Sequence, residues 1–273
     1  MKKTETIVQP VKKGRGRPKG TGKKQLETKP FDVSCINVVK GNNLNFSDNI
    51  FIPMATESDE LNTILSTKGG LMPATNMVLV GGPGSGKTTV VLDMLSGISR
   101  NGKKVLFISG EMDEIGYFKM CKRLPHFGDV PVLFLKEHAD NVKEVMEHVF
   151  QEGYDVIAID SLAEVIEMYK AAHKCSKTEA ETWLIIEQDK AKLAMNKRNI
   201  NTSFVNIQQQ TKGGDFVGSN RIKHMTDAMS HLEVSAEGER TMHFSKNRDC
   251  DKNFKIRFSF FKKNVFYSFQ TVA

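Results

Sequence analysis

The sequence has little cysteine and no long apolar run. Its 273 residues include four cysteines, which lie far apart and in no ligand-like pairs: Cys35, Cys121, Cys175 and Cys250. This spacing argues against a disulfide framework or a zinc site and favours a reducing compartment. Apolar stretches stay short of the roughly 18 residues that a membrane helix needs, and no apolar segment follows the charged N-terminus. We therefore expect a cytoplasmic protein without a membrane span or a secretory signal.

Acidic residues are scarce at the start of the chain. Residues 1–30 hold ten Lys and Arg against Glu5 and Glu27, a balance of +8 within a formal net charge of +7, so residues 31–273 carry about −1. The same segment holds three prolines and almost no large apolar residue, so it cannot bury enough surface to offset the entropy lost on ordering. We expect a disordered basic tail over 1–30 and one globular domain over 31–273.

The tail contains "KKGRGRPKG", whose core is Arg15-Gly16-Arg17-Pro18. That core resembles an AT-hook, in which two arginines enter the narrow and strongly negative minor groove of A·T-rich DNA. A generic polybasic arm that contacts phosphates without sequence preference is the alternative. Both interpretations predict a polyanionic partner, most simply DNA bound through Arg15 and Arg17.

The stretch "GGPGSGKTT", residues 81–89, matches the phosphate-binding motif G-x-x-x-x-G-K-[ST] and lies between an apolar run at 77–80 and a helical pattern at 89–98. Its glycines let backbone N–H groups converge on phosphates, Lys87 reaches the β and γ oxygens, and the Thr88 hydroxyl ligates Mg²⁺. The motif therefore predicts a site for ATP and Mg²⁺. The predicted binding residues are Gly81, Gly82, Pro83, Gly84, Ser85, Gly86, Lys87, Thr88 and Thr89.

An acid follows a second apolar run, "YDVIAIDS", at residues 154–161. Asp160 would lie at the carboxyl end of a buried parallel strand, where ligands of α/β proteins collect, and we predict that it holds Mg²⁺, with Ser161 as an assistant. The alternative is that Asp160 caps the helix that follows.

A third apolar run, 104–109 in "KKVLFISGEMDE", leads to Glu111. A carboxylate at this strand tip can orient or polarise the attacking water, so Glu111 is the predicted catalytic base. Asp113 and Glu114 are rivals for this role, and a solvated loop acid is the alternative for Glu111.

The strand predicted from "NTSFVNIQQQ" ends in three glutamines, and we predict that Gln209 senses the γ-phosphate. The loop that follows, "TKGGDFVGSNRIKHM" at 211–225, is rich in glycine and contains Lys212, Arg221 and Lys223. These cations suit a mobile segment that contacts DNA, while an ordinary solvated loop is the alternative.

The remaining patterns complete an α/β fold. Residues 174–199 have apolar side chains at helical spacing, namely Trp183, Ile186 and Leu193 with Ile185 nearby, and should form a helix that packs on the sheet. From 231 onward four short alternating segments suggest antiparallel strands that extend a mostly parallel twisted sheet. The aromatic residues of the last two segments are predicted to be core rather than a base-stacking surface: Phe258, Phe260, Phe266 and Phe269.

Six segments together resemble the RecA-like P-loop ATPase core of the RadA/Sms recombination proteins. They are "ESDELNTILSTKGGLMP", "VLVGGPGSGKTT", "VLFISGEM", "DVIAIDS", "QQTKGGDFVGSNRIKHMTDAMSHLE" and "FSKNRD", and they occur in the family's order over about residues 55–250. The resemblance implies a ring-forming, hexameric, DNA-stimulated ATPase that acts on single-stranded or branched DNA in recombination and repair, together with a recombinase. A nucleoid-associated or phage-encoded protein fits the same expectation.

In that family the segment corresponding to "KNRD" is a Lys-Asn-Arg-Phe-Gly motif that lies toward the nucleotide of the neighbouring subunit. The resemblance therefore implies that Lys246 and Arg248 stabilise transition-state charge in the neighbour's site. Two exposed cations at a strand edge are the alternative.

The sequence departs from the family in several places. Asp249-Cys250 replaces the family's Phe-Gly, and Gln209 stands where the family has histidine. We expect a motor core with a basic tail in place of the family's four-cysteine zinc module and without its Lon-protease-like domain. "SGEM" and Gln209 are also similar to DnaB-type helicases, so a replicative unwinding motor remains an alternative. A KaiC-like DNA-binding protein whose assembly is switched by ATP is another.

Overall fold

The computed structural model describes residues 38–210, 220–250, 254–261 and 263–270, except the side chains of Asn220 and Arg221. The chain forms two units, Met1–Asn45 and Phe46–Ala273. In the first unit, Gly41–Asn43 forms a 3-10 turn. The predicted tail at 1–30 lies outside the described residues, so the domain boundary at residue 31 stays a prediction.

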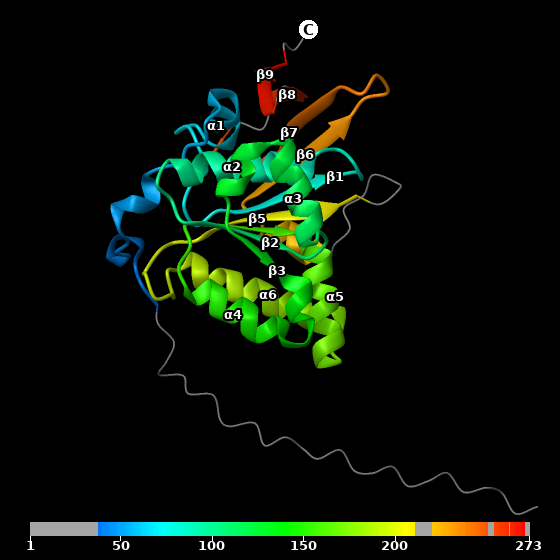
Figure 1. Cartoon of the computed structure of the whole chain (residues 1–273). Coiled ribbons are helices and arrows are strands. Elements are labelled where there is room, and N and C mark those ends of the chain that lie inside the picture. The colour runs from blue at the N-terminus through cyan, green and yellow to red at the C-terminus, as the bar shows by residue number, and fades with distance from the viewer. Residues whose placement is uncertain (1–37, 211–219, 251–253, 262, 271–273) are drawn as a thin grey trace, which may run out of the picture. The chain divides into compact units, whose positions relative to one another are not determined.

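A single sheet dominates the second unit, and in the described residues it has nine strands in the order β3-β2-β4-β5-β1-β6-β7-β8-β9 (Figure 1). Neighbours from β3 to β6 are parallel, and those from β6 to β9 are antiparallel. The strands are β1 Asn76–Gly81, β2 Val105–Ser109, β3 Val132–Phe134, β4 Val156–Asp160, β5 Ser203–Gln209, β6 Ala228–Val234, β7 Arg240–Asn247, β8 Lys255–Phe261 and β9 Asn264–Phe269. The predicted α/β fold with a mostly parallel sheet is therefore confirmed.

Helices cover both faces of the parallel strands (Figure 1). One face is covered by α2 Lys87–Arg100 and α3 Glu114–Arg123, while α1 Asp59–Leu65 packs on the antiparallel strands β8 and β9. The other is covered by α4 Val142–Gln151, α5 Leu162–His173 and α6 Lys177–Lys192. The short helix α7 spans Asn220–Met225, and 3-10 helices span Asp48–Phe51, Pro125–Asp129 and Leu135–Asn141. None of the helices in these described ranges combines the length and apolar character that a bilayer-spanning segment requires.

Two hydrophobic cores follow from this layering. Along β1, Met77 and Leu79 join the core beneath α2, while Val78 and Val80 join the core beneath α5 and α6. Because the central strands are buried on both faces, they appear in the sequence as continuous apolar runs, which is why they were predictable.

Helix α6 packs on the sheet as expected, but not through all of the expected residues. Ile186 and Leu193 are exposed and Trp183 is only partly buried, whereas Leu184 and Ile185 are buried. The helix also ends at Lys192, short of the predicted residue 199. The buried face also includes the polar residues Glu181, Glu187 and Gln188, so the apolar spacing alone identified that face only in part.

A closed ring of three buried amides explains why Gln188 lies on the buried face of α6. The Asn76 Nδ2 donates to Gln188 Oε1 at 2.9 Å, the Gln188 Nε2 donates to Asn206 Oδ1 at 3.0 Å, and the Asn206 Nδ2 donates to Asn76 Oδ1 at 2.8 Å. Each amide therefore has partners although it is buried, as buried polar groups require. The ring joins α6 to β1 and β5, the two strands that lead to the phosphate loop and to Gln209.

The C-terminal strands depart from the prediction in two details. The first of them, β6, is parallel to β1, so the antiparallel extension begins only at β7. Phe258 is buried and Phe260 packs against the core as predicted, but Phe266 and Phe269 are each 48% exposed, whereas Val265 and Tyr267 of the same strand pack against the core.

The predicted loop at 211–225 is also only partly a loop, because its last six residues form α7. Residues 211–219, which include Lys212, lie outside the described residues.

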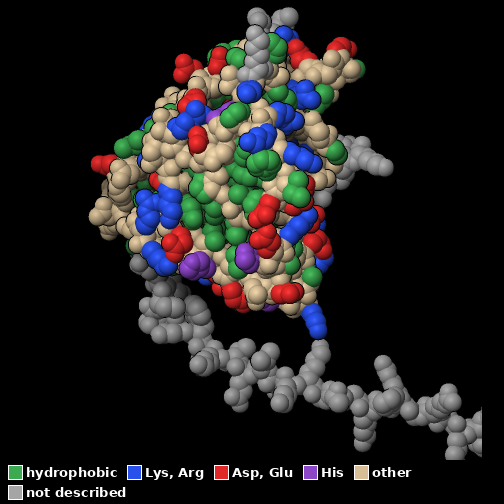
Figure 2. All heavy atoms as spheres, in the orientation of Figure 1, with side chains coloured by type: hydrophobic (Ala, Val, Ile, Leu, Met, Phe, Trp, Pro, Cys, Tyr) green, Lys and Arg blue, Asp and Glu red, His purple; other side chains and the backbone are tan. Residues whose placement is uncertain are grey.

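The face seen in Figure 2 carries Lys and Arg interspersed with Asp and Glu, with hydrophobic side chains near its middle. This mixed charge agrees with the balance of about −1 over residues 31–273.

Candidate nucleotide-binding site

The predicted phosphate loop connects β1 to α2 as expected. Gly84 and Gly86 have φ of 72° and 100°, a region that residues with a side chain rarely adopt. A Cβ on Gly81 would lie 2.8 Å from the Leu232 carbonyl oxygen. The loop therefore requires glycine at these positions for its backbone conformation and for its close contact with β6.

The ammonium group of Lys87 points back into this loop. Its Nζ donates to the carbonyl oxygens of Gly81 and Gly82, at 2.8 Å and 2.9 Å. Burial lowers the pKa of Lys87, and the nearby carboxylates of Asp160 and Glu111 oppose that shift. A cation held by flexible hydrogen bonds inside a glycine-rich loop suits the binding of phosphate oxygens.

Asp160 and Thr88 meet at the carboxyl end of β4. The Thr88 Oγ1 donates to Asp160 Oδ2 at 2.6 Å, and Asp160 is only 6% exposed. Burial raises the pKa of Asp160 to about 6, and Glu111 adds to the rise, while Thr88 and Lys87 oppose it. The alternative role as a helix cap does not hold, because Ser161 occupies the N-cap position of α5 and the Asp160 carboxylate contacts Thr88 instead.

The chemistry of this pair fits Mg²⁺. A hydroxyl oxygen and a carboxylate oxygen are hard donors of the kind that Mg²⁺ prefers, and the ion is usually held by one or two such protein groups together with phosphate oxygens and water. In the described part of the chain no group of three or more His, Cys, Asp or Glu side chains is placed to hold a metal ion. Because Thr88 and Asp160 contact each other beside the phosphate loop, they are the residues that would hold Mg²⁺.

Glu111 and Gln209 meet at the ends of β2 and β5. The Gln209 Nε2 donates to Glu111 Oε1 at 3.2 Å, and the backbone N–H of Glu111 donates to the Asp160 carbonyl at 3.3 Å. Of the two rivals, Asp113 caps α3 by accepting from the Gly116 N–H at 2.7 Å, and Glu114 lies in the first turn of that helix. Glu111 is the acid among these three that lines the phosphate pocket.

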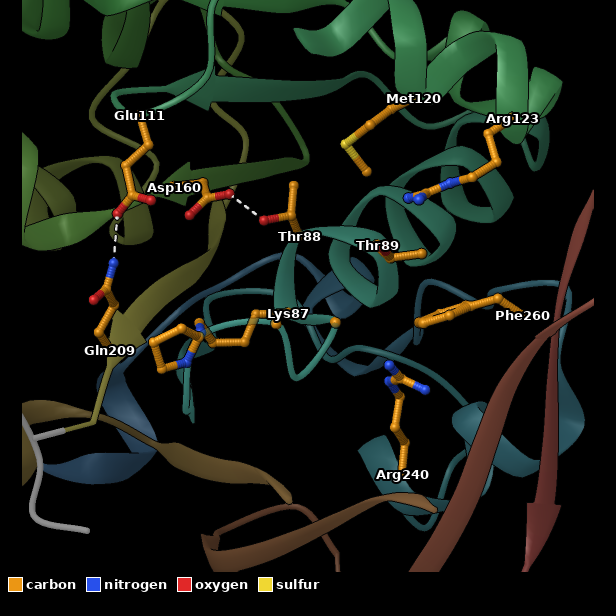
Figure 3. Close-up of a pocket in the computed structure, with 13 residues that line it drawn as sticks. Lys87, Thr88, Thr89, Glu111, Met120, Arg123, Asp160, Gln209, Arg240 and Phe260 are labelled. Atoms are coloured by element: carbon orange, nitrogen blue, oxygen red, sulfur yellow. Dashed lines mark hydrogen bonds between the residues drawn. The ribbon is translucent and has the colours of Figure 1, made fainter. Parts of the chain in front are cut away.

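These residues surround one cavity of about 500 Å³ (Figure 3). Sequence reasoning identified the phosphate loop, Glu111, Asp160 and Gln209 but missed four further residues that line the cavity: Met120, Arg123, Arg240 and Phe260. Met120 and Arg123 come from α3, Arg240 from β7 and Phe260 from β8. The one available signal was the alternation that places Phe260 on the same face as Phe258.

Lys246 and Arg248 lie away from this cavity. In the strand register Asn247 is level with Ala228, which is level with Met77 near the start of β1, while the phosphate loop begins at Gly81. The full length of β1 from Asn76 is five steps, or about 16 Å at roughly 3.3 Å per residue. The two cations therefore occupy the edge of the sheet opposite their own phosphate loop.

Both cations contact their own chain. The Arg248 Nη1 lies 3.1 Å from Asp227 Oδ1, although the arginine side chain is 63% exposed. The Lys246 Nζ donates to the carbonyl oxygens of Thr226 and His224. Partial burial and the neighbouring Arg248 lower the pKa of Lys246.

Most of the predicted DNA-binding residues lie outside the part of the chain that the structure describes. Arg15, Arg17 and Lys212 lie outside the described residues, and so does the side chain of Arg221. Lys223 is exposed on α7.

Comparison with known proteins supports the resemblance to RadA. No family model matches the chain. The DNA repair protein RadA of Campylobacter jejuni is 28% identical over 227 residues, which are 82% of this chain and 46% of that protein. RadA of Listeria monocytogenes is 31% identical over 180 residues, 65% of this chain and 36% of that protein. RadA of Streptococcus pneumoniae is 26% identical over 213 residues, 78% of this chain and 45% of that protein. The chain spans less than half the length of each of these three relatives.

A solved structure supports the fold. The flagellar accessory protein FlaH from Methanocaldococcus jannaschii superposes with a TM-score of 0.55 over 73% of this chain and 92% of FlaH, at 14% sequence identity. At this identity the likeness concerns the fold alone. The chain thus has a RecA-like α/β fold, and its resemblance to RadA-type RecA-like ATPases is confirmed.

Proposed function

We propose that this chain is a P-loop ATPase that works on DNA in repair, as the names of its RadA relatives indicate for those proteins. One observation carries the proposal. Side chains with complementary roles in phosphoryl transfer meet at the carboxyl ends of four parallel strands: Lys87, Thr88, Glu111, Asp160 and Gln209. The carboxyl ends of parallel strands are where α/β folds place their ligands.

Each residue has a defined role in this proposal. The loop N–H groups and Lys87 bind the phosphates, and Thr88 and Asp160 hold Mg²⁺, which neutralises developing charge on the phosphates when it is bound. Glu111 lies exposed at the rim of the pocket, where its carboxylate orients the attacking water and accepts its proton. The hydrogen bond from Gln209 orients that carboxylate, so Gln209 is a positioning residue that also reaches the γ-phosphate.

The same proposal assigns Lys246 and Arg248 to a neighbouring subunit's site. Two features support this assignment: their position at the edge opposite their own phosphate loop, and the exposure of Arg248. In a hexameric ring such an arginine acts across the subunit boundary, where arginine fingers contribute about 10³ to 10⁵ in rate.

The proposed DNA binding is supported by basic residues of this chain and by the names of the relatives. Arg15 and Arg17 in the tail, and Lys212, Arg221 and Lys223 around α7, would contact single-stranded or branched DNA during strand exchange or branch migration with a recombinase. We place this activity in the cytoplasm, at the nucleoid or in a phage-infected cell. Phosphate contacts by Lys and Arg supply most non-specific affinity and weaken as salt rises.

A DnaB-like unwinding motor is the second candidate, because Gln209, the proposed γ-phosphate sensor, resembles the glutamine of DnaB-type helicases rather than the histidine of the RadA/Sms family, and it bonds to Glu111. The two candidate functions can be distinguished by their activity on a forked duplex. A helicase of this kind unwinds a forked duplex without a recombinase, whereas a RadA-type motor extends strand exchange that a recombinase has begun.

The proposed function is tested by the ATP hydrolysis rate as a function of protein concentration, with and without single-stranded DNA. We expect the rate per subunit to rise with concentration, to rise further with DNA, and to fall about 10³-fold in Arg248→Ala. Arg257→Ala is the matched control, because Arg257 is also a partly exposed arginine, paired with Glu239 at 2.8 Å, but lies on β8. Its rate should match the wild type.

A flat rate per subunit that ignores both DNA and the Arg248→Ala change would contradict the shared site. Arg248 would then be a surface cation, and a DNA-tethered protein whose assembly is switched by ATP, as in the KaiC-like group, would be the better explanation. Strong binding of A·T-rich duplex that is lost on deletion of residues 1–30 would support that explanation.

A further inference from the structure

The nucleotide cavity has two chemically different ends (Figure 3). Glu111, Asp160 and Gln209 lie at one end, and the side chains that the phosphate motif does not involve lie at the other: Met120, Arg123, Arg240 and Phe260. The phosphate loop lies between them. When the γ-phosphate points to Glu111, the nucleoside must extend toward the opposite end.

Phe260 is held firmly at this second end. On β8 it shares a face with Phe258, and the two rings meet edge to face at 5.8 Å between centres. A Cβ on Gly86 would lie 2.9 Å from the Phe260 Cζ, so the ring rests directly against the phosphate loop. Phe260 is nevertheless only partly buried, because the rest of its surface lines the cavity.

Two arginines lie around the same space. The guanidinium carbon of Arg240 lies over the Phe260 ring at 5.2 Å from its centre, a cation–π contact, and the buried Arg240 Nε has no hydrogen-bond partner among the described residues. Arg123 enters from α3 on the other side of the cavity (Figure 3). Planar guanidinium groups stack on flat rings, and they donate hydrogen bonds but accept none.

We propose that Arg123, Arg240 and Phe260 form a nucleobase subsite that binds a purine by stacking and by donated hydrogen bonds. This inference rests on the proposed nucleotide binding. The side chains of the subsite offer no obligate hydrogen-bond acceptor for the adenine amino group, whereas both purines present acceptors at ring nitrogens or at a carbonyl oxygen. The subsite therefore accepts adenine and guanine alike.

The test compares ligands with and without a base by calorimetry on the full chain: MgATP, MgGTP and magnesium tripolyphosphate. We expect ATP and GTP to bind within about threefold of each other, because stacking is tolerant of base identity. In Phe260→Ala the Kd of both nucleotides should rise about tenfold, which corresponds to about 1.4 kcal/mol. The Kd of tripolyphosphate should stay unchanged, which also shows that the phosphate loop remains folded.

Phe261→Ala is the matched control, because Phe261 is the next residue on β8, lies 60% exposed and does not line the cavity. It should leave all three affinities unchanged. Arg123→Ala is a second variant at an exposed position that carries little risk to folding, and it should lower the preference for ATP over tripolyphosphate.

Three outcomes would overturn the inference. The first is an unchanged ATP Kd in Phe260→Ala, and the second is an equal loss for ATP and tripolyphosphate, which would mean that Phe260 acts only through the phosphate loop. The third is a strong preference for ATP over GTP. Failure of the wild type to bind either ATP or tripolyphosphate would instead reject the proposed nucleotide site itself, and the subsite with it.

Discussion

The parallel sheet has an amino edge, where its strands begin, and a carboxyl edge, where they end. The two edges carry similar charged residues in different surroundings. Asp155 precedes β4 and accepts from the Lys104 N–H at 2.8 Å, with Lys103 and Arg198 within 4.0 Å of its oxygens. Asp160 ends the same strand, where a neutral hydroxyl donates to its carboxylate. The acid at the amino edge thus has several cationic partners, whereas the acid at the carboxyl edge does not.

Lysines show the same contrast. Lys103 lies 4.0 Å from the Asp155 carboxylate, whereas Lys87 donates to two carbonyl oxygens of its own loop. Charges at the amino edge are compensated within the fold, which favours stability. At the carboxyl edge Lys87 is half-buried and Asp160 is buried, and both have shifted pKa values, an arrangement typical of sites that bind a charged ligand.

The largest effect is expected from removing the cation at the carboxyl edge. Lys87→Ala should lower ATP hydrolysis by about 10³-fold, because it removes a preorganised donor to the transferring phosphate. Lys103→Ala, at the amino edge, should leave the rate within about twofold, since surface ion pairs contribute little. Steady-state hydrolysis by both variants measures the difference. A comparable loss in both would show that the two edges are not distinct.

A smaller effect, with opposite signs for activity and stability, is expected at Asp160. Its pKa rises from 3.8 to about 6 in the folded state, so the folded protein binds this proton more tightly than the unfolded chain does. The contribution of Asp160 to the free energy of unfolding is therefore fully present below about pH 4 and is lost as the pH rises through about 6. The loss is about 3 kcal/mol at most. Asp160→Asn removes that cost at pH 8.

We expect Asp160→Asn to raise the free energy of unfolding by about 1 to 3 kcal/mol at pH 8 and by almost nothing at pH 4, while hydrolysis falls about 10²-fold. Asp155→Asn should instead lower stability by about 1 kcal/mol, because it removes the charge that Lys103 and Arg198 face. Urea unfolding at the two pH values measures both. An Asp160→Asn effect of the same size at both pH values would contradict the assigned pKa.

The residues that could be predicted from sequence all belong to short local patterns. The phosphate loop and Asp160 each come at the end of a continuous apolar run. Parallel strands end at the same edge of a sheet, so the sequence predicts that Lys87, Thr88, Glu111 and Asp160 lie close together. In the structure these four residues line the same cavity. Their roles remain predictions until the variants are measured.

Two of the four cavity residues that escaped prediction, Arg240 and Phe260, depend on pairings between distant segments. Arg240 and Phe260 reach the cavity because β7 and β8 add to the sheet in a particular register beyond β6, and a shift of one residue would turn both side chains away. The face of α6 escaped for a related reason. Gln188 is buried because Asn76 and Asn206 complete its hydrogen bonds, and nothing in the helix sequence alone reveals those partners.

The smallest effect on chemistry is expected from that amide ring, which separates stability from catalysis. Gln188→Leu leaves the amides of Asn76 and Asn206 short of partners, so the free energy of unfolding should fall by about 2 kcal/mol. Ile186→Ala, on the exposed side of the same helix, should change it by less than about 0.5 kcal/mol. Because the ring is buried between α6 and the sheet and does not line the cavity, the KM for ATP should stay unchanged in both variants. The contrary outcome is a raised KM in Gln188→Leu at a temperature where the protein is fully folded. It would mean that α6 positions β1 and β5 for nucleotide binding. Residues of the interior would then contribute to the reactive carboxyl edge as well as to stability.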